Sequence, residues 1–189
     1  MIICLVRHGQ TNWNIRHLLQ GRTDNELNET GKTQAKQVGE YLKKHDPNWD
    51  VFVSSPLKRA TQTAEIIKDS LGFEDEIIID ENLIERAFGE LEGEVLNEAS
   101  YDLLDLEITK GLETKKELQE RSLNALLNLE KKFKNKKVIA FSHAQFIKSI
   151  ITQLDENYNF RSPLKNSSMN YFEVKDGKVK IIKYNVVAN

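Results

Sequence analysis

Runs of apolar residues predict short β-strands along this chain of 189 residues. Four such runs lie at 2–6 ("IICLV"), 50–55 ("DVFVSS"), 77–80 ("IIID") and 137–142 ("KVIAFS"). Three of them are continuous enough to be buried on both faces, which is typical of parallel sheets. Near the end of the chain, "MNYFEVKDGKVKIIKYNV" predicts two further strands joined by a hairpin turn at Asp176-Gly177.

Apolar residues at helical spacing fill the stretches between these strands. They predict helices at 30–45, 56–72, roughly 113–134 and about 144–154. For the second helix we expect Ser55 as the N-cap, Pro56 as the first helical residue and Gly72 as the stop.

This order of elements predicts an α/β protein. We expect three α/β/α layers with a mostly parallel central sheet plus an antiparallel edge. No repeat or Pro/Gly/Ser-rich linker divides residues 1–189, so they are predicted to form a single domain with a small helical cap-like insertion at about 94–112. The leucines of 94–108 fit either a helix packed on the core or a lid over a cleft.

Charge and cysteine content exclude several classes of protein. A net charge of −2 provides no electrostatic basis for binding nucleic acid or an anionic membrane. Cys4 is the only cysteine, so an internal disulfide and a thiolate metal site are excluded. No apolar segment approaches the length of a membrane span, and "MIICLV" is too short for a signal-peptide core. We therefore expect a cytoplasmic protein.

Basic residues stand at or just after the ends of three predicted strands. Arg7-His8 ends the first strand, Arg59 comes just after the second, and His143 follows a later one. Because ligands of open α/β sheets bind outside the carboxyl ends of the strands, we expect these groups to gather at one edge.

Two imidazoles and two guanidiniums at one edge suit a phosphate. Arginine binds phosphate oxygens in a bidentate manner and stays charged, and a neutral imidazole nitrogen is a nucleophile near pH 7. A lone histidine in a strand-end loop is more often structural, and Arg59 alone would be expected on the surface. Their arrival together at three strand ends favours the phosphate site.

A set of motifs in a fixed order adds a family resemblance. "RHGQTNWN", "LLQGRTDNELNETGKTQA", "SSPLKRATQTA", "LIERAFGELEG", "FSHAQFIKSI" and "NSSMNYFEV" follow one another along most of the chain. This series resembles the histidine phosphatase superfamily, also called the phosphoglycerate mutase-like family.

The resemblance implies catalytic roles for five residues. It makes His8 the nucleophile that becomes a phosphohistidine, with Arg7, Arg59 and His143 forming the phosphate pocket around it. Glu85 in "LIERAFGELEG" matches the proton donor of the family. The other acids nearby are expected to be solvated; they are Glu81, Glu90, Glu92 and Glu94. No metal ion and no cofactor are implied.

Further positions are implied to contact the phosphate or the neighbouring substrate oxygen. They include Asn14, Gln20 and the backbone near Gly21. Ala144 stands where the family usually has glycine, but its backbone N–H remains able to bind phosphate. Thr11 is expected to orient the loop or to touch phosphate.

Three functions compete at this point: a metal-independent phosphatase, a cofactor-dependent phosphoglycerate mutase and a catalytically silent phosphate-binding protein. All five implied catalytic residues are present, which argues against the silent protein. Arg86 matches a basic residue of the mutases and is a possible substrate contact, but Ala87 and Phe88 replace the His-Tyr pair expected next. The short segment 93–121 also lacks the paired arginines and the longer insertion of the mutases. We expect a phosphatase acting on a small phosphorylated metabolite, as a monomer or a homodimer.

Overall fold

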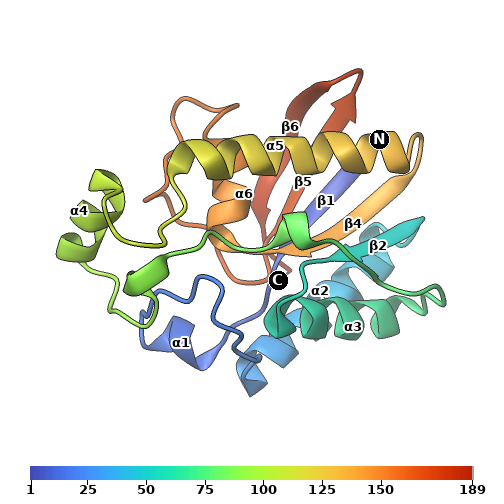
Figure 1. The fold of residues 1–189 in the computed structure, drawn as a ribbon. Helices are drawn as coiled ribbons and strands as arrows, with labels where there is room; N and C mark the ends of the chain where they lie inside the picture. Colours follow the sequence, from blue (N-terminus) through green and yellow to red (C-terminus); the bar gives the residue numbers. More distant parts are fainter. Residues whose placement is uncertain (189) are drawn as a thin grey trace.

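A computed structural model describes residues 1–188, built around one mixed six-stranded sheet (Figure 1). The strand order is β3-β2-β4-β1-β5-β6, with β1 to β4 parallel to one another and β5 and β6 antiparallel. The strands are β1 (Ile2–Arg7), β2 (Val51–Ser54), β3 (Ile78–Ile79), β4 (Lys137–Ser142), β5 (Met169–Lys175) and β6 (Lys178–Val186). The predicted mostly parallel sheet with an antiparallel edge is confirmed.

Helices cover both faces of this sheet and complete the predicted three layers. Successive residues of β1 point to opposite sides, so that Ile3 and Leu5 join one apolar cluster while Cys4 and Val6 join the other. The first cluster lies under α5 (Lys115–Lys132) and α6 (Ala144–Ile151), the second under α2 (Glu29–His45) and α3 (Lys58–Leu71). Within residues 1–188, no helix is both long and apolar enough to cross a membrane.

The start of α3 differs from the prediction. The helix begins at Lys58, so Ser55 is not its N-cap and Pro56 is not its first residue. The side chain of Asp24 accepts the Lys58 N–H at 2.7 Å, so a residue distant in sequence provides the cap. The predicted end is correct: Gly72 is left-handed, with φ 66°.

The C-terminal hairpin forms as predicted. Asp176 and Gly177 have φ of 51° and 73°, the positive values that a type I′ turn requires. The turn lets β6 return antiparallel alongside β5, and β6 then forms one edge of the sheet. At the other edge, β3 is shorter than expected and leaves Ile79 half exposed.

The segment predicted as a cap carries α4 (Glu98–Leu106), which stands apart from the sheet in Figure 1. Leu104 packs with Leu19, Phe88 and Leu91 in a small cluster separate from the two under the sheet. From the loop after α6, Arg161 donates to the acids of α4 and stacks on its Tyr101 at 4.6 Å. The helix is therefore anchored to its own small core, and a lid function for it stays a prediction.

Candidate active site

Two strand ends bring two histidines together. Arg7 at the end of β1 pairs in register with Ser142 at the end of β4, and the residues that follow are His8 and His143. Their ring centroids lie 5.3 Å apart, and both side chains are buried. The gathering of these groups at one sheet edge follows from the parallel register.

The His8 ring is held in one tautomer. Its Nδ1 lies 2.7 Å from the carbonyl oxygen of Gly9. A carbonyl can only accept a hydrogen bond, so Nδ1 carries the proton and Nε2 keeps its lone pair. Burial, followed by the charges of Arg59 and Arg7, lowers the pKa of His8 well below its ordinary value of 6.5. The ring is neutral and nucleophilic at neutral pH.

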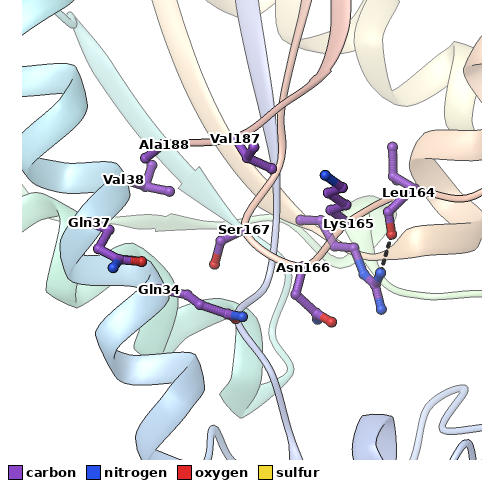
Figure 2. Close-up of a pocket in the computed structure, with 10 residues that line it drawn as sticks. Gln34, Gln37, Val38, Leu164, Lys165, Asn166, Ser167, Val187 and Ala188 are labelled. Atoms are coloured by element: carbon purple, nitrogen blue, oxygen red, sulfur yellow. Dashed lines mark hydrogen bonds between the residues drawn. The ribbon is translucent and has the colours of Figure 1, made fainter.

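The loop after His8 is fixed by side chains that the sequence did not single out. Thr63 of α3 accepts the Gly9 N–H at 3.0 Å, and Gln34 of α2 accepts the Gln10 N–H at 2.9 Å. Asn166 donates to the His8 carbonyl at 3.1 Å. Gln34 and Asn166 line a common cavity of about 490 Å³, whose lining residues are drawn in Figure 2. These side chains lie within motifs quoted above, but the backbone groups that they bind are distant in the sequence.

Two buried guanidiniums are positioned by backbone carbonyls. Arg59 donates to Thr23 O and to Gly21 O, both at 2.7 Å, and Arg7 donates to Leu164 O. Burial lowers the pKa of each arginine to about 10, so both remain charged at neutral pH.

Polar atoms of this site are left unpaired. Within the described residues, the Nε atoms of Arg7 and Arg59 and the Nδ1 of His143 are buried and have no hydrogen-bond partner. The other ring nitrogen of His143 lies 2.7 Å from the Ser55 hydroxyl. Burying an unpaired polar group is costly, and the oxygens of a bound phosphate would pair with such groups.

Glu85 lies between two short 3-10 turns, Glu81–Leu83 and Gly89–Leu91, and is buried. Its carboxylate accepts the N–H groups of Gln145 at 3.1 Å and Phe146 at 3.0 Å, in the first turn of α6. Since α6 begins directly after His143, these bonds place the carboxyl group close to that histidine. A role as proton donor is compatible with this position and stays a prediction.

The Thr11 hydroxyl contacts two of the other side chains that were expected near phosphate. Its hydroxyl lies 3.0 Å from Gln20 Oε1 and 3.2 Å from Asn14 Oδ1. Gly21 takes part through its carbonyl, which holds Arg59. Ala144 is the first residue of α6 and partly exposed. Direct contact of these residues with phosphate stays a prediction.

Arg86, expected as a possible substrate contact, is buried and held by groups of the segment 107–113. Its side chain is 1% exposed. It donates to the Glu113 carbonyl at 2.7 Å and pairs with Glu107 at 3.2 Å. These bonds use Nε and Nη2 of the guanidinium, and substrate contact by Arg86 stays a prediction.

Taken together, the geometry suits phosphoryl transfer. A neutral imidazole and two buried, charged guanidiniums lie at one edge of the sheet, and the Glu85 carboxyl group is held at the start of α6. Among residues 1–188, no group of three His, Cys, Asp or Glu side chains is arranged to hold a metal ion.

Comparisons with known proteins point in the same direction. The family model of the histidine phosphatase superfamily (branch 1) matches residues 3–187. An uncharacterized phosphatase of Bacillus subtilis, PhoE, is 38% identical over 188 residues, which cover 97% of this chain and 94% of that protein. A metal-independent phosphoserine phosphatase of Arabidopsis thaliana is 35% identical over 187 residues, covering 93% of this chain and 77% of that protein.

A solved structure of a related protein has a similar fold. A mutant phosphoserine phosphatase of Entamoeba histolytica, in complex with phosphoserine, superposes with a TM-score of 0.81 and is 28% identical. The superposition covers 97% of this chain and 96% of that one. The chain belongs to the histidine phosphatase superfamily.

Proposed function

We propose that this protein is a metal-independent phosphatase that hydrolyses a small phosphate monoester through a phosphohistidine on His8. One observation carries the proposal. The Nε2 of a buried, neutral His8 is free to attack, and the buried Nε atoms of Arg7 and Arg59 have no partner within the described residues. A phosphoryl group is the ligand that satisfies both conditions.

The reaction proceeds in two transfers of the same phosphoryl group. His8 Nε2 attacks phosphorus, the ester P–O bond breaks, and Glu85 gives its proton to the leaving alcohol. Water then attacks the phosphohistidine while the Glu85 carboxylate takes a proton from it, and the N–P bond breaks to release phosphate. Arg7, Arg59 and His143 stabilise the charge on the phosphoryl oxygens in both steps.

Phosphoserine is the first substrate to test, because it is the named ligand of the Entamoeba structure and the named substrate of the Arabidopsis relative. A mutase would use the same phosphohistidine but return the phosphoryl group to a substrate hydroxyl. Arg86, the basic residue that suggested a mutase-like carboxylate contact, is paired with Glu107 inside the protein, which favours the phosphatase over the mutase.

The test is phosphate release from an aryl phosphate in excess chelator. We expect the wild-type protein to stay active, His8→Ala to lose all measurable activity, and the exposed control His45→Ala to match wild type. Loss of wild-type activity in chelator would contradict metal independence. Activity that persists in His8→Ala would show that another group is the nucleophile. Exchange between phosphoglycerates without phosphate release would identify a mutase instead.

A further inference from the structure

The loop Gly21–Thr23 supplies both carbonyls that hold the Arg59 guanidinium. Nη2 donates to Gly21 O and Nη1 to Thr23 O, each at 2.7 Å. The direction of the remaining Arg59 N–H groups therefore depends on where this loop lies. A loop needs support of its own to fix a buried charge to within a fraction of an ångström.

A single carboxylate provides that support. Glu92 Oε1 accepts the Arg22 N–H at 2.9 Å, while Oε2 accepts the Thr23 N–H at 3.0 Å and the Thr23 hydroxyl at 2.6 Å. Oε1 also accepts the Phe88 N–H at 3.2 Å. Four donors converge on two oxygens, so Glu92 is not the solvated acid that its sequence context suggested.

Gly21 shows how closely the loop lies against this carboxylate. Its φ is +50°, and a Cβ built on it would meet Glu92 Oε1 at 2.1 Å. Any other residue at this position would push the carboxylate or the loop away. The contact is therefore a close fit between the Gly21 backbone and the Glu92 side chain.

We propose that Glu92 is a positioning residue that sets the Arg59 guanidinium in the phosphate pocket by bracing the loop 21–23. The inference rests on the proposed function, because it assumes that Arg59 binds the phosphoryl group. Glu92 reaches Arg59 only through the loop, since its hydrogen bonds go to Arg22, Thr23 and Phe88. Its negative charge also lies near enough to Arg59 to favour the charged guanidinium.

The substitution Glu92→Gln tests this. The amide keeps the size of the side chain but turns one acceptor into a donor that faces backbone N–H groups. We expect the dissociation constant for inorganic phosphate, measured by calorimetry, to rise about tenfold, as expected for the loss of one charge-assisted hydrogen-bond set. Glu90→Gln is the matched control, since Glu90 is an exposed acid two residues away. It should bind phosphate like wild type.

A double-mutant cycle separates positioning from general destabilisation. If Glu92 acts through Arg59, then Glu92→Gln should not weaken phosphate binding further in an Arg59→Gln background. Equal effects of Glu92→Gln in both backgrounds would overturn the inference, as would unchanged phosphate binding in the single variant. A wild-type protein that neither binds phosphate nor hydrolyses esters would instead overturn the proposed function on which the inference rests.

Discussion

The state of His8 follows from its surroundings rather than from its own chemistry. The Gly9 carbonyl at 2.7 Å fixes the proton on Nδ1, and burial, followed by the charges of Arg59 and Arg7, lowers the pKa of the ring and disfavours a second proton. Arg59 and Arg7 would therefore act twice, first by keeping the nucleophile neutral and then by binding the phosphoryl oxygens. Neutral His8 and charged arginines are the combination that a phosphohistidine mechanism requires.

The same electrostatics make stability depend on pH. The pKa values of His8 and His143 lie below their ordinary value of 6.5, so the unfolded chain binds more protons than the folded one just below that pH. The contribution of these two neutral histidines to the free energy of unfolding is complete above pH 6.5. It declines as the pH falls toward their pKa values in the folded protein. We expect the phosphate-free Tm to fall between about pH 7 and pH 5, and to fall less in His8→Ala.

The control for this prediction is His45→Ala, because His45 is exposed at the end of α2. Its Tm should fall with pH as steeply as that of wild type. Equal slopes for wild type and His8→Ala would contradict a buried His8 that resists protonation.

The role proposed for Glu85 predicts a dependence on the leaving group. An alkoxide leaves poorly without a proton, whereas an aryl oxide is a better leaving group. Glu85→Gln should therefore slow hydrolysis of an alkyl ester such as phosphoserine by roughly 10²–10⁴-fold, the usual contribution of a general acid. Formation of the phosphohistidine from an aryl phosphate, followed as a burst of released phenol, should slow much less. Equal losses with both esters would contradict the assignment.

At the scale of elements, the position of the loop after His8 depends on how closely α2 approaches it. Gly31 lies in the first turn of α2, and a Cβ built there would meet Gln10 O at 2.1 Å. Gly9 is equally close from the other side, since its Cβ would meet Gly31 O at 2.4 Å. Two glycines thus let two backbones touch next to the proposed nucleophile.

This contact reverses the ordinary effect of a helix substitution. Alanine in place of glycine inside a helix usually adds up to about 1 kcal/mol of stability. Gly31→Ala should instead lower both the Tm and kcat/KM, because the methyl group displaces the loop after His8. The neighbouring exposed position provides the control: Thr30→Ala should leave both values near wild type. A stabilised, fully active Gly31→Ala protein would show that the loop tolerates this displacement.

At the scale of the whole molecule, much of the fold was predictable because its signals are local. Buried strands such as β1 and β4 are continuous apolar runs, and the parallel pairing of Arg7 with Ser142 then brings His8 and His143 together. The Asp176-Gly177 turn was equally visible, because its backbone requires those residue types.

What sequence reasoning missed are contacts between residues far apart in the chain. Asp24 caps α3 from a distance of 34 residues, and Glu92 braces a loop about 70 residues before it. Thr63 and Gln34 lie within quoted motifs, but no local signal shows that they hold the loop after His8. Polar residues of this kind are expected on the surface by default. Only the tertiary structure shows which of them cap a helix or hold a loop in place.

The most direct measurement is to trap the intermediate. The wild-type protein is mixed with an aryl phosphate in excess chelator, quenched rapidly in alkali, which preserves phosphohistidine, and digested for mass spectrometry of its peptides. We predict one acid-labile phosphoryl group, located on His8 and absent from His8→Ala. A phosphoryl group on another residue, or turnover with no phosphorylated peptide at any quench time, would contradict it.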